Sequence, residues 1–227
     1  MNTLHRELLE QLQNCIIRGK IDAKSVHPKD LVGKNGADEL AQLLLTQGVV
    51  PESILRDGML AGMKVVGERF KSRSIFVPDV MMSAKAMNRA MKHLEPFFAS
   101  RALHHYGIFI IGTVAGDLHD IGKNLAAMFI RGAGWNVIDL GVDVSPKLFS
   151  EAVIQNPGCV VGLSALLTTT MLNMRPTIEA IRGIDANTKV IIGGAPLTKQ
   201  FAQEIDADHY SPDPQDAVAY LEVLKAL

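Results

Sequence analysis

The sequence predicts an α/β protein that begins with a four-helix bundle and continues as a flavodoxin-like, Rossmann-type doubly wound parallel sheet of about five strands. Two observations support this fold class. Residues 1–98 place apolar side chains at helical spacing. Residues 106–227 alternate short apolar runs with helical segments, which is typical of a parallel sheet covered on both faces. We expect residues 99–105 to form a hinge linker between the two domains.

Composition narrows the class of protein. The chain has 227 residues, a formal net charge of -1 and 21% charged residues, so no basic excess suggests nucleic-acid binding. No apolar run is long enough to span a membrane and no signal core follows Met1, so we expect no membrane association and a cytoplasmic location. Cys15 and Cys159 match no metal or redox spacing and are expected to be small buried residues.

Helical spacing and stop signals define the elements of the first domain. Gly19 and Gly48 follow helical patterns as stops, and Pro51 occupies a first-turn position. The expected helices cover residues 4–16, 38–47, 51–70 and 79–94. Because the connections are short, these helices are predicted to pack as an antiparallel bundle.

The last two of these helices are rich in methionine and glycine. Six of the ten methionines occur there, either as plain core or as an adaptable apolar lid over a large flat ligand. Gly58, Gly62 and Gly67 cost helix stability, so they indicate close approach of a helix or a ligand. The six methionines are Met59, Met63, Met81, Met82, Met87 and Met91.

The second domain is predicted from its alternating pattern. Strands are expected at residues 107–112, 136–140, 159–164 and 190–192, with a short fifth strand near 209–210. Helices are expected at residues 121–131, 146–155, 172–182, 199–205 and 214–224. Asp213 precedes Pro214 and is a plausible N-cap of the last helix.

The loop after the first strand carries the main candidate site. It runs from Gly116 to Asn124 and contains Asp117, His119 and Asp120. Ligands of open α/β sheets bind beyond the carboxyl ends of the strands, and a histidine held by a carboxylate can bind a metal there. A simpler alternative is a helix start capped by Asp117 or Asp120, with a solvated histidine.

The other loops at the same edge support a ligand site. Residues 141–143, 164–170 and 193–196 follow the next three strands and supply hydroxyl groups and a glycine pair. Taken alone, the pair Gly193-Gly194 could equally form an ordinary turn and contact no ligand. The glycine-rich motifs that bind nucleotide phosphates are missing from the sequence, so phosphate chemistry is disfavoured.

Taken together, these motifs resemble a known family. The matching stretches are Asp-Leu-His-Asp-Ile-Gly-Lys-Asn at 117–124, Ser164-x-Leu166, Gly193-Gly194, Phe76-Val77-Pro78 and the segment 91–97. The chain resembles, over nearly all its length, the stand-alone corrinoid (cobalamin-binding) proteins of methyltransferase systems. It is also similar to the cobalamin-binding module of cobalamin-dependent methionine synthase.

The resemblance implies cobalamin bound base-off/His-on, with His119 as the lower cobalt ligand. Asp117 would hydrogen-bond the other ring nitrogen, and Thr170, where the family has a hydroxyl, would extend this relay. The displaced base would lie beside Ser164 and along Gly193. The cofactor contacts implied are Phe76, Val77, Met82, Gly116, Asp117, Leu118, His119, Asp120, Ile121, Gly122, Val142, Ser164, Leu166, Thr168, Thr170, Gly193, Gly194, Ala195 and Tyr210.

The function implied is that of a methyl carrier. It would accept a methyl group from a substrate-specific methyltransferase and pass it to a second methyltransferase with a thiol or tetrahydrofolate acceptor, and a reductive activation protein would serve it. We expect a carrier subunit that is not catalytic alone.

Three alternatives are open. A cobalamin sensor would be expected to add an output module. The small subunit of a cobalamin-dependent mutase would not need the methionine-rich bundle. A receiver-like domain without cofactor would leave the motifs at the strand ends unexplained.

Overall fold

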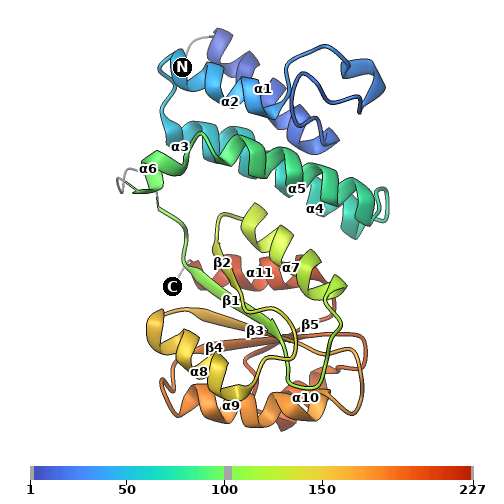
Figure 1. Ribbon diagram of the computed structural model, residues 1–227, viewed down its shortest axis with the longest axis vertical. Coiled ribbons are helices and arrows are strands. Elements are labelled where there is room, and N and C mark those ends of the chain that lie inside the picture. Colours follow the sequence, from blue (N-terminus) through green and yellow to red (C-terminus); the bar gives the residue numbers. More distant parts are fainter. Residues whose placement is uncertain (1–2, 100–103, 226–227) are drawn as a thin grey trace. The chain divides into compact units, whose positions relative to one another are not determined.

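The computed structural model describes residues 3–99 and 104–225, and it divides into two compact units (Figure 1). The first unit ends at His104 and the second begins at His105. Residues 100–103 of the predicted hinge lie outside the described residues, so the hinge stays a prediction.

Helices build the first unit, as predicted. They are α1 (Thr3–Arg18), α2 (Ala37–Thr46), a third helix in three parts, and α5 (Val77–Met91). The third helix consists of α3 (Pro51–Ser53), a π-helical segment (Ile54–Leu60) and α4 (Ala61–Lys71). The structure differs from the prediction in these elements: the third helix contains a π-helical segment, α5 begins and ends earlier than expected, and a short α6 (Glu95–Ala99) follows it.

Tight helix packing accounts for two of the glycines in the third helix. A Cβ at Gly58 would lie 2.8 Å from Leu12 Cδ2, and one at Gly62 would lie 2.9 Å from Ile16 Cβ. Met59, Met63 and Met87 are buried in the core of this unit, so for these three residues the plain-core interpretation holds. Met82 is partly buried, Met91 likewise, and Met81 is exposed.

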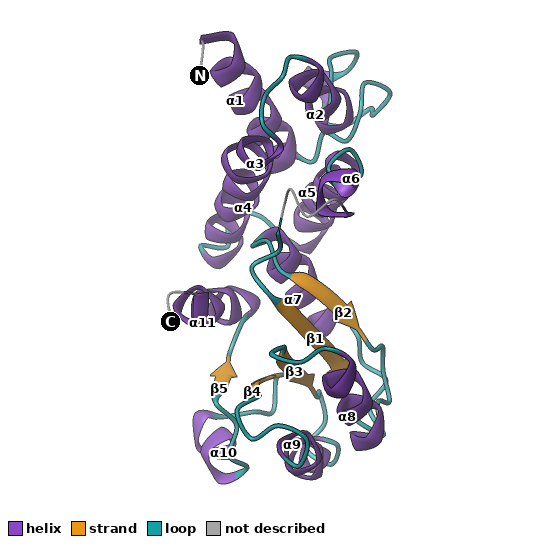
Figure 2. Cartoon of the chain, turned by 90° about the vertical axis from the view of Figure 1, so that its left-hand side faces the viewer, coloured by secondary structure: helices purple, strands orange, loops and turns teal. Residues whose placement is uncertain are grey.

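The second unit contains the predicted five-stranded parallel sheet (Figure 2). Its strands are β1 (Ile108–Thr113), β2 (Asn136–Asp139), β3 (Val160–Ser164), β4 (Lys189–Gly193) and β5 (His209–Ser211). The order is β2-β1-β3-β4-β5, and every neighbouring pair is parallel. The connections therefore reverse direction between β1 and β3, which is where ligands bind in doubly wound sheets.

Helices cover both faces of this sheet (Figure 1). α7 (Ile121–Gly132) and α11 (Pro214–Lys225) pack on the face that carries Phe109 and Ile111. α8 (Pro146–Gln155), α9 (Met174–Arg182) and α10 (Lys199–Glu204) pack on the opposite face, and a short 3-10 turn (Met171–Asn173) leads into α9. The two cores fix the sheet and so the position of its carboxyl edge.

Local signals set the helix starts. The Asp213 carboxylate accepts hydrogen bonds from the backbone N–H groups of Gln215 and Asp216, which confirms the predicted N-cap of α11. Asp120 precedes α7, but its carboxylate accepts from the Asn124 side chain at 2.9 Å and makes no capping bond. The simple capped-helix interpretation of the histidine loop is therefore not what the structure shows.

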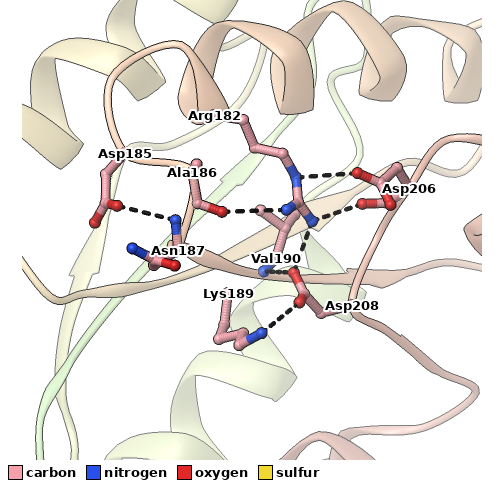
Figure 3. A network of polar contacts seen from close by, with 8 residues as sticks. All are labelled: Arg182, Asp185, Ala186, Asn187, Lys189, Val190, Asp206 and Asp208. Atoms are coloured by element: carbon pink, nitrogen blue, oxygen red, sulfur yellow. Dashed lines mark hydrogen bonds and ion pairs between the residues drawn. The ribbon is translucent and has the colours of Figure 1, made fainter.

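A polar cluster ties down the amino ends of β4 and β5 (Figure 3). The Arg182 guanidinium donates to the Asp208 carboxylate at 3.0 Å and to the Asp206 carbonyl at 2.8 Å. The same carboxylate accepts from the Val190 N–H and the Lys189 ammonium, both at 2.9 Å. This cluster lies at the edge opposite the strand-end loops, so it is structural.

Both cysteines are buried, as predicted. Within residues 3–99 and 104–225, none of the helices combines the length and apolar character that a membrane span requires.

Candidate functional site

A buried carboxylate organises the loop after β1. Asp117 is fully buried and accepts four hydrogen bonds. One oxygen accepts from the His119 N–H at 3.0 Å and from His119 Nδ1 at 2.7 Å. The other accepts from the Leu166 N–H at 2.8 Å and from the Thr170 hydroxyl at 2.6 Å. The structure thus brings together Asp117, His119 and Thr170, as the sequence predicted.

Two opposing effects set the charge of this carboxylate. Burial raises the pKa of Asp117, but the hydrogen bonds from Thr170, Leu166 and His119 lower it more. The pKa of Asp117 is therefore held well below its usual range, and the group is ionised at neutral pH. An ionised carboxylate only accepts hydrogen bonds, so the short contact requires the proton on His119 Nδ1.

That proton position leaves the other ring nitrogen available. With Nδ1 donating to Asp117, the neutral imidazole presents a lone pair at Nε2. About half of the His119 side chain is exposed, whereas the carboxylate behind it is sealed from solvent. An imidazole oriented by a carboxylate at one nitrogen is the usual arrangement of a metal-binding histidine.

The backbone of the loop is pinned at several points. The Thr113 hydroxyl donates to the His119 carbonyl at 2.9 Å, and the Asn173 amide donates to the Ala115 carbonyl at 2.8 Å. The Gly116 N–H donates to the Asp143 carboxylate at 2.6 Å. Gly116 has φ +79°, a conformation that suits glycine. These contacts preorganise the histidine before any ligand is present.

A buried ion pair joins the start of α7 to the end of β2. The Lys123 ammonium is almost fully buried and lies 2.7 Å from one oxygen of Asp139 and 2.7 Å from the Asn124 amide oxygen. The same Asp139 oxygen accepts from the Gly141 N–H at 2.9 Å. The pair therefore links the helix that follows His119 to the loop that carries Val142.

Exposed apolar side chains lie close to His119 in the sequence and on the neighbouring loops. Leu118 and Ile121 are 72% and 74% exposed, although both are large aliphatic residues. Val142, Leu166 and Leu167 on the neighbouring loops are also exposed. Apolar surface of this kind at the ligand edge of a sheet fits a large, mostly apolar ligand.

The strand ends below these loops form a row of small residues. The register places Thr113 beside Ser164, Ser164 beside Gly193, and Gly193 beside Ser211. A Cβ at Gly193 would meet only the Ser211 carbonyl oxygen, at 3.5 Å, so the space over this glycine is open. A Cβ at Gly194 would lie 1.8 Å from the Ala165 carbonyl oxygen, so Gly194 is required by packing.

The other predicted contact residues lie in several places. Asp120, Thr168 and Ala195 are exposed on the same set of loops, and Gly122 is exposed in the first turn of α7. Tyr210 is partly buried against the core under α8, α9 and α10, the face opposite to Phe109. In the helical unit, Phe76 is 68% exposed, whereas Val77 and Met82 are partly covered. Cofactor contact by each of these residues stays a prediction.

The donor set fits a corrinoid better than a free metal ion. Among the residues that the structure describes, no group of three His, Cys, Asp or Glu side chains could hold a metal ion. A corrin ring would supply most of the donors to its cobalt itself, so the protein could hold the group with a single further donor. His119, flanked by the exposed aliphatic side chains of Leu118 and Ile121, could be that donor.

Sequence reasoning missed several supporting residues. Thr113 holds the loop across six positions, and Asp143 and Asn173 hold it across 27 and 58 positions. No sequence motif indicates these hydrogen bonds. Lys123 stood inside the motif, but the sequence alone did not show its partner Asp139. Ser211 is the last residue of β5, and no sequence pattern singles it out.

Comparisons with known proteins show which family this chain resembles. A B12 binding domain model matches residues 107–219, and a second B12 binding domain model matches residues 33–95. Dimethylamine corrinoid protein 1 of Methanosarcina acetivorans is 38% identical over 226 residues, covering 97% of this chain and 98% of the relative. Trimethylamine corrinoid protein 2 of Methanosarcina mazei is 40% identical over 187 residues, covering 81% and 86%.

Solved structures show the same architecture. The methanol:cobalamin methyltransferase complex MtaBC from Methanosarcina barkeri matches with a TM-score of 0.82 at 27% identity, covering 97% of this chain and 80% of that chain. A cobalamin-binding protein from Desulfitobacterium hafniense DCB-2 matches with a TM-score of 0.71 at 28% identity, covering 94% and 97%. The chain therefore belongs to the family of B12-binding corrinoid proteins.

Proposed function

We propose that this chain carries a methyl group on a corrinoid between two methyltransferases, with His119 as the lower cobalt ligand and the corrinoid's own base displaced. The observation that carries this proposal is the hydrogen bond from His119 Nδ1 to the buried Asp117 carboxylate, which leaves Nε2 free to bind cobalt. The relatives named for dimethylamine and trimethylamine support the carrier role, since they match this chain over both of its units.

When bound, the corrinoid supplies a cobalt centre that takes up a methyl group and gives it up. The chain's contribution is to fix the position and orientation of the His119 ring through Asp117 and the backbone contacts of the loop. Because the imidazole is oriented before the corrinoid arrives, little conformational entropy is lost on ligation.

Asp117 also controls the proton on the imidazole. With cobalt at Nε2, the Nδ1–H group would donate to the carboxylate, and the ionised Asp117 would stabilise any positive charge on the ring. The Thr170 hydroxyl holds the far oxygen of the same carboxylate and so extends the relay. In this proposal Asp117 and Thr170 would tune how strongly the imidazole holds cobalt.

With a corrinoid bound, the apolar side chains around this histidine would exclude water from its lower side. Leu118, Ile121 and Leu166 would lie against the lower side of the ring. The helical unit would cover the upper face through Phe76, Val77 and Met82, and residues 99–105 would act as the hinge that lets it move aside. In this proposal a substrate-specific methyltransferase, a thiol or tetrahydrofolate methyltransferase and a reductive activation protein take turns at the exposed face.

Two other cobalamin proteins are less consistent with the chain. A mutase small subunit would not need the helical unit, yet the named relatives cover it along with the sheet. A sensor would favour adenosylcobalamin and an output partner. Dimethylamine, trimethylamine and methanol are the substrates in the names of the relatives and of the matched complex, so we propose a small methylated compound as donor.

Methyl transfer tests this proposal directly. The full chain is loaded with hydroxocobalamin, reduced, treated with isotopically labelled iodomethane and passed through gel filtration. We expect label to remain with the protein and to move to a thiol or tetrahydrofolate only after an acceptor methyltransferase is added. Retention of adenosylcobalamin together with failure to take up methyl label would contradict the carrier role and favour the mutase or sensor classes.

A further inference from the structure

An aspartate in the segment between β2 and α8 has a backbone conformation that favours glycine. Asp143 has φ +53°, and its side chain is exposed to solvent. A left-handed conformation strains a residue that carries a Cβ, and a glycine at this position would relieve that strain. The chain uses glycine for the same conformation two residues earlier, at Gly141 with φ +87°. An aspartate at position 143 therefore points to a use for its side chain.

The side chain and the backbone of Asp143 both hold the start of the histidine loop. The carboxylate accepts a hydrogen bond from the Gly116 N–H at 2.6 Å, and the Asp143 N–H donates to the Asp117 carbonyl at 3.0 Å. Asp117 in turn carries the carboxylate that orients the His119 ring. A chain of contacts thus runs from an exposed residue after β2 to the histidine after β1.

The same segment also holds the far end of the histidine loop. Asp139, four residues before Asp143, forms the ion pair with Lys123, which lies four residues after His119. Two carboxylates of one segment thus fasten the loop before and after the histidine. The end at Lys123 is also restrained by α7, whereas Gly116 lies in a turn and its N–H is held by the Asp143 carboxylate. The entry to the loop is therefore the end that depends on this side chain.

From this geometry we propose that Asp143 is a positioning residue for the cobalt ligand. Its carboxylate holds the Gly116 N–H and thereby keeps the Asp117–His119 pair in the orientation that presents Nε2. This inference deepens the proposed function and rests on it. A loop that moves at Gly116 would let the His119 ring sample orientations that do not reach cobalt, so ligation would cost more conformational entropy.

Three variants of the full chain separate the hydrogen bond from the backbone strain. Asp143→Gly removes the carboxylate and relieves the strain. Asp143→Asn keeps an acceptor oxygen in a residue type that tolerates positive φ. Asp206→Gly is the matched control, because Asp206 has φ +60° and an exposed side chain in the same unit but lies at the opposite edge of the sheet.

Amide hydrogen exchange of the apoprotein, followed by NMR, is the first readout. The His119 N–H is informative because its hydrogen-bond partner is the Asp117 carboxylate and not Asp143. We expect it to exchange about tenfold faster in Asp143→Gly, in line with the loss of one charge-assisted hydrogen bond. In Asp143→Asn and Asp206→Gly it should exchange nearly as in the wild type. Core amides such as that of Val161 should be unchanged in all three variants.

The cobalt(II) spectrum is the second readout. Each protein, with nitrogen-15 in its histidines, is loaded with hydroxocobalamin and reduced. The fraction of cobalt that shows axial coupling to a labelled histidine nitrogen should fall in Asp143→Gly. It should return towards the wild-type fraction in Asp143→Asn and stay unchanged in Asp206→Gly. A merely structural role of Asp143 would not produce this pattern in a protein whose core amides are unaffected.

Other results would overturn the inference. Unchanged exchange at His119 in Asp143→Gly would show that the loop holds without the carboxylate. If Asp143→Asn behaves like Asp143→Gly, the hydrogen bond is not the cause, and equal loosening by Asp206→Gly would assign the effect to glycine itself. Faster exchange throughout the sheet would mean general destabilisation. Failure of the proposed function looks different, because the wild type would then show no histidine coupling to cobalt, while the exchange measurement needs no corrinoid.

Discussion

The Thr170 hydroxyl donates a 2.6 Å hydrogen bond to the Asp117 carboxylate, although the two residues are 53 positions apart. The opposite oxygen of that carboxylate holds His119. A single buried anion thus connects the loop after β3 with His119, the proposed cobalt ligand, in the loop after β1. The predictions below follow from this connection and from the contacts that surround it.

Replacing Thr170 with valine removes the hydroxyl and keeps the shape of the side chain. The buried carboxylate then lacks one charge-assisted hydrogen bond, which should lower the free energy of unfolding by about 1.5–3 kcal/mol. Thr169→Val is the matched control, because Thr169 is exposed, and it should change stability by less than about 0.5 kcal/mol. Urea unfolding of the two apoproteins makes the comparison, and equal effects would argue against the Thr170 contact.

Stability should depend on pH through Asp117. Its pKa is depressed in the folded chain, so its contribution is complete above the unfolded value of about 3.9 and is lost as the pH falls below that value. The wild type should exceed Asp117→Asn in stability most clearly near pH 7, and the gap should narrow below about pH 4. The urea unfolding midpoints of both proteins, measured from neutral to acid pH, report this difference in stability. A gap that stays constant would show that the carboxylate is not the source.

The ion pair between the buried Lys123 and Asp139 should contribute more to stability than an exposed ion pair does. Asp139 is 27% exposed, so the cost of stranding it in Lys123→Met is expected to be about 1–3 kcal/mol, less than for a fully buried charge. Lys147→Met breaks an exposed pair with Glu151 and should cost less than about 0.5 kcal/mol. The double variant Lys123→Met, Asp139→Leu should recover much of the loss in urea unfolding. No recovery would mean that the lysine acts through other contacts.

The adjacent glycines after β4 should respond differently to alanine. Gly193→Ala meets open space, so the apoprotein should fold normally and bind cobalamin at least about tenfold more weakly, a loss of about 1.4 kcal/mol. Gly194→Ala places a Cβ 1.8 Å from a backbone oxygen at φ +145°, so the apoprotein itself should be destabilised. Thermal unfolding and corrinoid titration separate the two effects. A destabilised Gly193→Ala with normal affinity would contradict the open space.

Much of this fold could be predicted because its signals are local. The apolar runs of β1 and β3 and the helical spacing of α7 and α8 are each contained in about a dozen residues, and the structure confirms them. The π-helical segment 54–60 could not be foreseen, since the helical spacing of its residues is the same as that of an ordinary α-helix.

The site divides in the same way. Asp117 and His119 are two residues apart, so their pairing could be predicted from one motif. Asn173, Asp143 and Asp139 act through contacts across 58, 27 and 16 positions, which only the folded sheet brings together.

Electron paramagnetic resonance of the cobalt(II) form tests the central claim most directly. The chain is loaded with hydroxocobalamin, reduced, and compared as wild type, as wild type with nitrogen-15 in its histidines, and as His119→Ala. The account predicts axial nitrogen coupling that changes with the histidine label and disappears in His119→Ala. A spectrum that is the same with and without the nitrogen-15 label, and that is unchanged in His119→Ala, would contradict the assignment of His119 as the cobalt ligand.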